Sequence, residues 1–197
     1  QPNEKILDMC AAPGGKAAHI AALTDNRAEL WVNDNSRTRL HKMRANFDRL
    51  GVEPADATMY DATQLARRLR VNESGEHFDK ILLDAPCSGE GLMNYASDKD
   101  FASWSVAHIK RLNTLQKRLI SQAWHLLVPG GTLVYSTCTM APEENEAVVD
   151  YLLRHNDDVQ VKPIEVKLLN QVKPVLIWQG KMYSSELSKC IRLVPST

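Results

Sequence analysis

Short apolar runs alternate with amphipathic stretches along most of the chain, and polar or turn-forming residues bound each run. The first apolar run is Lys5–Met9, followed by the small-residue segment Cys10–Gly15 and the helical pattern of Lys16–Leu23. A second run, Leu30–Asp34, precedes residues 36–51, in which apolar positions recur at helical spacing. This order of strand, loop, helix and strand predicts the opening unit of a doubly wound α/β sheet.

The same alternation continues into the middle of the chain. We predict a weak third strand at Ala57–Tyr60, a short helix at Gln64–Arg70, a loop at Asn72–Glu76 and a strong fourth strand at Phe78–Asp84. The polar, glycine-bearing segment Ala85–Ala102 is long, which makes it a candidate substrate loop.

The second half of the chain adds a long helix and further strands. Residues 109–126 predict an amphipathic helix that Pro129–Gly131 ends, and Thr132–Ser136 predicts a fifth strand. Pro142 and the glutamates after it predict the start of another helix. The remainder, Val159–Val194, predicts two or three strands. Strands alternating with helices, then a strand-rich tail, predict an α/β fold with a mainly parallel sheet and an antiparallel edge.

Composition narrows the class of protein. At 197 residues the chain is one domain, and its 24 Lys and Arg balance 24 Asp and Glu, so no overall basic charge indicates a nucleic-acid binder. No apolar run is long enough to span a membrane and no signal peptide is evident. The chain starts without a methionine, almost directly on its first strand, so we interpret it as a fragment or excised domain whose upstream part is missing.

Acids end three of the predicted strands, and in a parallel sheet their tips face one crevice together with the small-residue loop. Such an edge suits a ligand with several hydroxyls and amines; a tight connection without a ligand is the alternative for the loop. The loop is neither a dinucleotide fingerprint nor a phosphate loop, because Ala17 rather than a hydroxyl residue follows Lys16. The acids are Asp34, placed to bind a ribose or to be an ordinary surface acid, Asp61 and Asp84.

Five cations surround the apolar stripe of the helix predicted after Asp34. We favour a solvated face for them, with contact to RNA as the alternative. They are Arg37, Arg39, Lys42, Arg44 and Arg49.

The four cysteines form no C-x-x-C pair, which argues against a zinc site and a disulfide framework and favours a reducing, intracellular setting. Cys87 follows the fourth strand and Cys138 the fifth, so both thiols can face one pocket at neighbouring tips. Cys10 is placed to line the ligand loop, and Cys190 lies in an apolar run typical of a core. The six histidines show no metal or triad spacing.

These motifs together resemble one family, the Sun-type (Nol/Nop/Sun) RNA cytosine-5 methyltransferases, which use S-adenosylmethionine. The resemblance covers essentially the whole chain and implies a seven-stranded, Rossmann-like methyltransferase domain at 1–197, with the RNA-binding segment that usually precedes it absent. The motifs are DMCAAPGGK at 8–16, DAPCSGEG at 84–91, LVPGGTLVYSTCT at 127–139 and PEENEAVV at 142–149.

The resemblance also implies a role for each matching residue. Asp34 would hold the ribose hydroxyls, Asp61 would lie near the adenine amine, and Asp84 would lie between cofactor and target base. Cys138 would be the nucleophile and Cys87 the second cysteine that helps release the product. The residues expected to bind the cofactor are Cys10, Ala11, Ala12, Pro13, Gly14, Gly15, Lys16, Asp34, Arg39, Asp61 and Asp84.

The chemistry of cytosine methylation requires these groups. A thiolate that attacks carbon 6 makes carbon 5 nucleophilic toward the methyl group, which is covalent catalysis. A protonated Asp84 near ring nitrogen 3 would stabilise the developing charge. A proton acceptor must then take the proton from carbon 5, and Cys87 and a bound water are rival candidates for this role. The target cytosine must leave any base stack to reach the pocket. The rival assignment makes Cys87 the nucleophile, as a Pro-Cys pair does in DNA cytosine-5 methyltransferases.

We therefore expect an intracellular, cytoplasmic, monomeric enzyme with no metal and no membrane that forms 5-methylcytidine in RNA, ribosomal RNA first and transfer RNA second. Two departures from the family pattern are Thr139 in place of serine and the lack of basic residues in 92–97. We expect this chain to bind cofactor but to methylate RNA weakly, because the RNA-binding segment is absent. The other hypotheses are a catalytically idle cofactor-binding RNA scaffold and a nicotinamide-dependent oxidoreductase, which the missing G-x-G-x-x-G disfavours.

Overall fold

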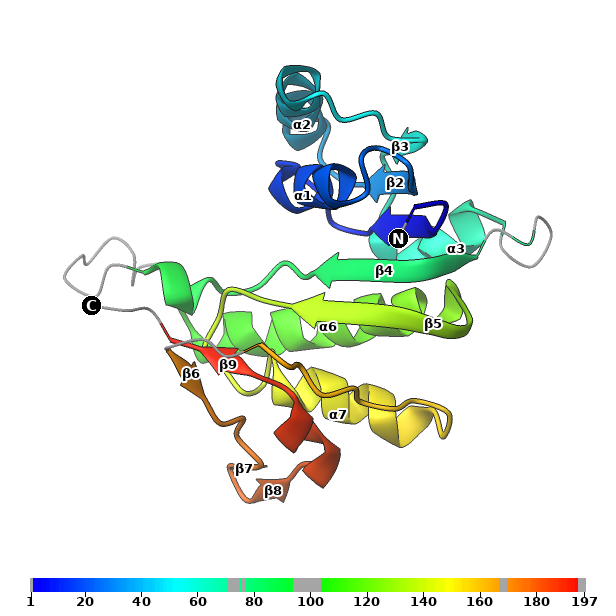
Figure 1. The fold of residues 1–197 in the computed structure, drawn as a ribbon. Coiled ribbons are helices and arrows are strands. Elements are labelled where there is room, and N and C mark those ends of the chain that lie inside the picture. Colours follow the sequence, from blue (N-terminus) through cyan, green and yellow to red (C-terminus); the bar gives the residue numbers. More distant parts are fainter. Residues whose placement is uncertain (1, 71–74, 76, 94–103, 167–169, 195–197) are drawn as a thin grey trace. The chain divides into compact units, whose positions relative to one another are not determined.

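The computed structural model describes residues 2–70, 75, 77–93, 104–166 and 170–194. The chain divides into two compact units (Figure 1). Unit 1 comprises Gln1–Ala85 and Arg118–Ser136, and unit 2 comprises Pro86–Lys117 and Thr137–Thr197.

Unit 1 contains a five-stranded parallel sheet of order β3-β2-β1-β4-β5. The mainly parallel sheet predicted from the sequence is thereby confirmed. Leu7 of the central strand pairs with Trp31 on one side and Ile81 on the other. The strand order reverses between β1 and β4, so the loops after these two strands flank the switch point at which such sheets bind ligands. The strands are β1 (Lys5–Asp8), β2 (Glu29–Asn33), β3 (Asp56–Thr58), β4 (Phe78–Asp84) and β5 (Leu127–Ser136).

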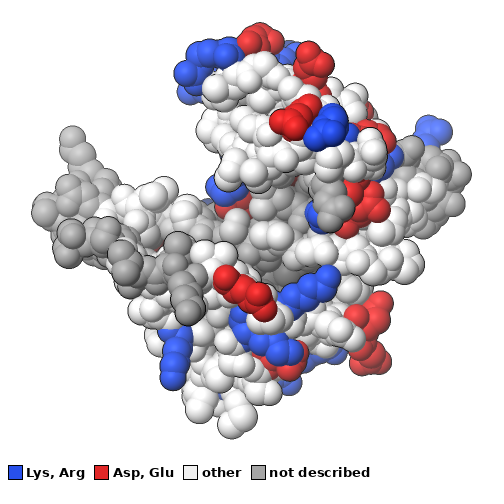
Figure 2. Space-filling model, viewed as in Figure 1, with Lys and Arg blue, Asp and Glu red and all other residues white. Residues whose placement is uncertain are grey.

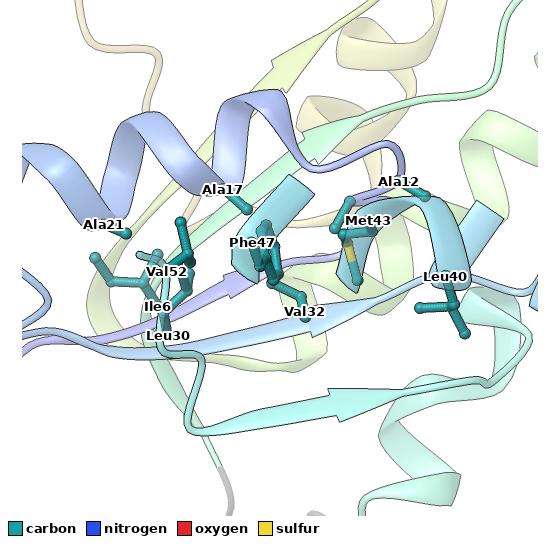
Figure 3. Close-up of a cluster of buried hydrophobic side chains, with 11 residues drawn as sticks. Ile6, Ala12, Ala17, Ala21, Leu30, Val32, Leu40, Met43, Phe47 and Val52 are labelled. Carbon is teal, nitrogen blue, oxygen red and sulfur yellow. The ribbon is translucent and has the colours of Figure 1, made fainter. Parts of the chain in front are cut away.

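One face of β1 and β2 is covered by α1 (Gly15–Leu23) and α2 (Arg37–Leu50), both close to their predicted positions. Figure 3 shows alanines of α1 and larger side chains of α2 meeting over these strands. Ser36 caps α2 by accepting from the Arg39 N–H, and Gly51 ends the helix in the left-handed region. The buried residues of this cluster are Ile6, Ala11, Ala12, Ala17, Ala21, Leu30, Val32, Leu40, Met43, Phe47 and Val52.

The short helix predicted at 64–70 is a 3₁₀ turn, η1 (Ala62–Gln64), that leads into α3 (Leu65–Arg68). The long helix is α6 (Val106–His125), whose residues from 118 onward belong to unit 1. The Ala66 N–H of α3 donates to Gln122 Oε1 of α6 at 3.3 Å, which ties the two helices together.

The Pro129–Gly131 turn lies inside β5, so the prediction that it ends the long helix was wrong. α6 ends at His125, and Leu127 already pairs with Phe78. The reason is burial: Leu126 and Leu127 are both buried at the sheet, and the Leu126 carbonyl accepts from the Phe78 N–H at 2.9 Å. The turn is a bulge at which the β4–β5 register shifts.

Unit 2 holds the loops after β4 and β5, the first part of α6, α7 (Glu146–His155) and a tail of short elements. The strands of the tail pair antiparallel as β6–β9 and β7–β8 in two separate two-stranded sheets, so among the described residues the parallel sheet has five strands. The short elements are η2 (Glu90–Leu92), β6 (Gln171–Val172), β7 (Ile177–Trp178), β8 (Lys181–Met182), η3 (Ser185–Lys189) and β9 (Arg192–Leu193).

A helix begins after Pro142, as predicted, but two of the glutamates at its start are buried. Residues 142–145 are turns, and α7 begins at Glu146. Glu144 and Glu146 are buried. Glu146 forms a two-point ion pair with Arg192, at 2.6 and 2.5 Å, and Arg192 also donates to the Met140 carbonyl at 2.8 Å. Pairing of this kind lets the fold bury a charged side chain.

Residues 71–74, 76 and 94–102, which include most of the predicted loop 72–76 and half of the predicted loop 85–102, lie outside the described residues. None of the helices described here is long and apolar enough to cross a membrane. Within the same ranges, no three His, Cys, Asp or Glu side chains gather as metal ligands would.

Candidate active site

The loop after β1 is held against α2 by a glycine. Gly14 has φ of +99°, and a Cβ there would lie 2.8 Å from both Met43 Cγ and Phe47 Cε1. A Cβ at Gly15 would meet nothing within 4 Å. The small residues were predicted to let a ligand approach the backbone; that reasoning applies to Gly15, whereas Gly14 is required by the core.

Asp34 and Arg39 bind the backbone N–H and the carbonyl of Ala12, respectively. The buried Asp34 carboxylate accepts the Ala12 N–H at 3.3 Å and the Ser36 N–H at 2.9 Å. Arg39 donates to the Ala12 carbonyl and lies 3.3 Å from Asp34 Oδ2. The predicted ribose acid therefore shapes the loop, and its four lone-pair positions leave room for a hydroxyl donor.

Asn33 is a residue that sequence reasoning did not single out. Its Nδ2 donates to the Met9 and Tyr60 carbonyls, both at 3.1 Å. Its Oδ1 accepts from the Thr58 hydroxyl at 2.8 Å and the Tyr60 N–H at 3.0 Å. The buried amide thus joins the loops that follow β1 and β3. A polar residue in an otherwise apolar strand, just before its terminal acid, was the available signal.

Asp84 ends β4 and has a partner on each oxygen. Lys16 Nζ lies 2.7 Å from Oδ2, and the Ser136 hydroxyl donates to Oδ1 at 2.8 Å. Both oxygens act as acceptors, as in an ionised carboxylate. Two residues predicted for the site are therefore in direct contact, and the protonated Asp84 of the sequence hypothesis would first have to exchange one of these partners.

Asp8 is a second residue without a predicted role. It ends β1 and is 1% exposed, and neither carboxylate oxygen has a hydrogen-bond partner among the described residues by distance and angle. Burial, followed by the charge of Asp84, raises its pKa to about 7, while the Cys10 backbone N–H and Lys16 oppose the shift. Burial and the charges of Asp8 and Asp34 also raise the pKa of the Cys10 thiol to about 12, so Cys10 is not a nucleophile at neutral pH.

Asp61 caps η1. Its Oδ1 accepts from the Thr63 N–H at 2.9 Å and the Thr63 hydroxyl at 2.8 Å, and these bonds hold the pKa of the carboxyl below its usual value. Hydrogen bonds link the loop Cys10–Lys16, Asp34, Arg39 and Asp84 into one group. Asp61 follows Tyr60, whose carbonyl accepts a hydrogen bond from Asn33.

The cations of α2 include two that line a pocket. Arg37, His41 and Arg44 surround a cavity of about 330 Å³ whose apolar lining is Leu40, Ala57 and Met59. Figure 2 shows basic and acidic side chains interspersed on the face in view, in line with the balanced composition. The face of α2 that carries these cations is thus hollowed by this pocket.

In unit 2, the two cysteine loops meet through their sulfur atoms. Cys87 Sγ lies 2.9 Å from Cys138 Sγ, both are free thiols, and the Cys138 N–H donates to Cys87 Sγ at 3.2 Å. The two thiols that were predicted to face one pocket are thus in contact. Cys138 is exposed and Cys87 half-buried. Burial, and then the hydrogen bond to Cys138, raise the pKa of Cys87 to about 12, so Cys87 is a thiol at neutral pH.

Hydroxyl and carboxylate groups fasten the two loops to each other. The Thr139 hydroxyl contacts the Ser88 hydroxyl at 2.7 Å and Glu90 Oε2 at 3.1 Å. Glu90 Oε2 also accepts the Met140 N–H, and the Gly91 N–H donates to the Cys138 carbonyl at 3.0 Å. Thr139, one of the two departures from the family pattern, thus supplies a hydroxyl that links the two loops.

Asn145 closes the Cys138 loop from behind. Its Oδ1 accepts from the Thr137 hydroxyl at 2.6 Å, and its Nδ2 donates to the Thr139 and Ala141 carbonyls at 3.0 and 2.9 Å. Asn145 lies within the PEENE motif, so its position was noted in the sequence, but its contacts were not predicted.

Comparisons with known proteins show which family the chain belongs to. A family model described as 16S rRNA methyltransferase RsmB/F matches residues 1–185. The chain is 43% identical over 196 residues to the tRNA (cytosine(49)-C(5))-methyltransferase of Pyrococcus abyssi, covering 99% of this chain and 60% of the relative. It is 40% identical over 163 residues to the ribosomal RNA small subunit methyltransferase F of Erwinia tasmaniensis, covering 82% of this chain and 33% of that protein.

Solved structures agree. NSun6 from Pyrococcus horikoshii with SFG has a TM-score of 0.71 and 36% identity, covering 84% of this chain and 40% of that one. A methyltransferase homolog protein from the same organism has a TM-score of 0.75 and 35% identity, covering 96% and 55%. The chain thus spans between a third and 60% of the two curated relatives. The resemblance to Sun-type enzymes is confirmed, and the chain belongs to the RsmB/F family of RNA methyltransferases.

Proposed function

We propose that the protein transfers a methyl group from S-adenosylmethionine to carbon 5 of a cytosine in RNA, with Cys138 as the nucleophile. The observation that carries the proposal is the pair of thiols 2.9 Å apart on the loops after β4 and β5. Two relatives support it: the Pyrococcus abyssi protein is named for carbon 5 of a cytosine in tRNA, and the Erwinia tasmaniensis protein is named as a methyltransferase of small-subunit ribosomal RNA.

The residues of unit 1 fit the cofactor. Gly14 at the N-cap of α1 has no side chain to occupy the N–H groups of the first turn, and the space beside Gly15 is open. A carboxylate group can therefore be received there, while Asp34 accepts hydroxyl hydrogens and Asp61 keeps Oδ2 for an amine. When bound, the cofactor supplies a methyl group on a positively charged sulfur.

The two cysteines divide the work by protonation. Cys87 holds its proton at neutral pH, which makes it a poor nucleophile, whereas the exposed Cys138 can attack carbon 6 as a thiolate. After methylation a bound water takes the proton from carbon 5. The released electron pair forms the double bond between carbons 5 and 6 as the bond from carbon 6 to the Cys138 sulfur breaks, and the electron pair of that bond stays on the sulfur. The Cys87 thiol protonates the departing Cys138 sulfur.

Several finer points belong to this proposal. Ribosomal RNA is the first substrate candidate, since the family model is described by 16S rRNA, and transfer RNA is the alternative. We infer one cytoplasmic, monomeric catalytic domain at 1–197 with a seven-stranded, mainly parallel sheet and an antiparallel edge strand. We expect the isolated chain to bind cofactor and to methylate RNA weakly. The cofactor-binding scaffold remains the rival, whereas membership of an RNA methyltransferase family argues against an oxidoreductase.

Methyl transfer from labelled cofactor to separated unmodified ribosomal and transfer RNAs, followed by nucleoside analysis, tests the proposal. We expect 5-methylcytidine in one fraction, a loss of about 10³-fold or more with Cys138→Ala, and a stable RNA–protein adduct with Cys87→Ala. Loss of methylation with Cys87→Ala alone would transfer the nucleophile to Cys87. Cofactor binding without label in any RNA would favour the scaffold.

A further inference from the structure

Two buried polar side chains of unit 2 lie beside Cys87 and have no role in the reaction described above. Gln116 of α6 and Glu144, in the turn before α7, are both 0% exposed. Gln116 Nε2 donates to Glu144 Oε2 at 2.8 Å. Burying a carboxylate and an amide is costly unless their hydrogen bonds are satisfied, so the pair needs a structural or functional reason.

The partners of this pair flank Cys87 in the chain. Gln116 Nε2 also donates to the Pro86 carbonyl at 2.9 Å, and Glu144 Oε2 accepts the Ser88 N–H at 3.1 Å. The main-chain groups immediately before and after Cys87 are therefore both fixed. Neither bond reaches the cysteine, so the pair sets where the Cys87 sulfur lies without touching it.

The Cys138 loop is held by other groups. Glu90 accepts from Thr139 and from the Met140 N–H, and Asn145 binds Thr137 and the Thr139 carbonyl. Loss of Glu144 or Gln116 should consequently displace Cys87 and leave most of the hydrogen bonds of the Cys138 loop in place.

We propose that Glu144 and Gln116 are positioning residues that hold the Cys87 thiol against Cys138 and thereby set the rate of product release. The inference rests on the proposed function, in which carbon 5 loses its proton, the bond from carbon 6 to sulfur breaks and its electron pair goes to Cys138. A displaced Cys87 cannot deliver its proton to that sulfur, so the covalent RNA–protein species persists.

A measurement without RNA tests the positioning itself. Diamide joins two thiols that can touch, taking their two hydrogens and becoming the hydrazine, and peptide mapping without reductant identifies the Cys87–Cys138 product. We expect Glu144→Ala and Gln116→Met to slow this cross-link about tenfold or more, since small displacements have large effects on reactions that require close approach. Methionine fills the volume of Gln116 but removes both donors.

Two further variants separate positioning from general loss of structure. Glu144→Gln keeps an acceptor oxygen and should restore the wild-type cross-linking rate. Glu143→Ala is the matched control, because the neighbouring glutamate binds Trp178 and Gln179 rather than the Cys87 segment. A cross-linking rate that stays at the wild-type value in Glu144→Ala and Gln116→Met would overturn the proposal. So would equal slowing in Glu143→Ala.

The same variants are then assayed with unmodified ribosomal and transfer RNAs and labelled cofactor. We expect Glu144→Ala to accumulate a methylated RNA–protein adduct, as Cys87→Ala does, with cofactor affinity unchanged. Equal loss of adduct and of free product in Glu144→Ala would indicate a merely structural role and contradict the proposal. If no variant, Cys87→Ala included, forms adduct while the diamide result holds, the proposed function fails and the positioning role stands.

Discussion

Two asparagines, one in each unit, show how differently the two groups of site residues are built. Asn33 uses both ends of its amide to join segments that follow regular strands, and it is fully buried. Asn145 binds three groups within nine residues of its own position, so it shapes one local loop. The loop after β1 is thus tied to the sheet through Asn33, whereas the Cys138 loop is held by its neighbour Asn145 and by Ser88 and Glu90 of the other cysteine loop.

The difference indicates which perturbations each group tolerates. A change in the packing of unit 1 moves several loop segments together, because a single amide joins them. A change in unit 2 is felt by one loop and its cysteine. Variants at matched residue types can therefore separate the two dependences.

Alanine at each asparagine gives the largest expected effects. Asn33→Ala leaves the Tyr60 N–H and the Met9 carbonyl without their partner, and we expect a loss of about 3 kcal/mol in the free energy of unfolding. Asn145→Ala should cost about 2 kcal/mol. Denaturant unfolding gives both values, and calorimetric titration with the cofactor together with diamide cross-linking gives the effect on each group of residues.

Each asparagine is expected to affect only its own group of residues. We expect Asn33→Ala to weaken cofactor binding and to leave the Cys87–Cys138 cross-link unchanged, and Asn145→Ala to do the opposite. Asn26→Ala serves as control, since this exposed amide binds Gly51 and Glu53, which belong to neither group of site residues. Equal effects of Asn33→Ala and Asn145→Ala on both readouts would mean that the loops are not fixed independently.

The adjacent glycines Gly14 and Gly15 are expected to differ in how much an added methyl group changes the stability of the protein. Gly14→Ala adds a Cβ 2.8 Å from Met43 and Phe47 in a left-handed backbone, and we expect a cost of about 2 kcal/mol or more. Gly15→Ala adds a methyl in open space at the start of α1 and should be neutral or slightly stabilising. Thermal unfolding of the two variants checks this, and similar melting temperatures would refute the packing role of Gly14.

The effect expected from Asp8 varies in size with pH. The folded protein keeps a proton on Asp8 up to about pH 7, whereas the usual pKa is 3.8, so this group makes stability fall as pH rises from about 4 to 7. Asp8→Asn should remove this fall and raise stability at pH 8 by about 1–3 kcal/mol. Melting curves between pH 5 and 8 measure the slope; an unchanged slope in Asp8→Asn would exclude Asp8 as its source.

Sequence periodicity predicted unit 1 far better than unit 2. Parallel strands such as Phe78–Asp84 bury apolar runs, so their pattern is local and readable, and the acids at their ends follow from the same pattern. Pro129–Gly131 was misjudged because a bulge and a helix stop use the same residues. Glu144, Glu146 and Asp8 had no readable role, since the partners that permit burial of a charge, or leave it uncompensated, lie far away in sequence.

The family motifs supplied the residues of the site more fully than their contacts. Neighbouring strands predicted that Cys87 and Cys138 lie at adjacent strand tips, and the structure adds a contact of 2.9 Å between their sulfur atoms. The contact between Lys16 and Asp84 joins residues 68 positions apart, and no local pattern predicts it. Charged side chains on exposed loops can choose among several partners, so their pairing is decided by the folded backbone.

The contact of Gly14 with Met43 and Phe47 has a consequence for protein engineering. Met43 and Phe47, on the interior side of α2, set the position of the loop through their contact with Gly14, although both side chains are buried. A library that spares the conserved-looking loop and varies only the hydrophobic interior would therefore still alter ligand affinity. Trimming Phe47 in a Gly14→Ala variant would recover only part of the lost stability, because Met43 Cγ also lies 2.8 Å from the new methyl and the backbone stays left-handed.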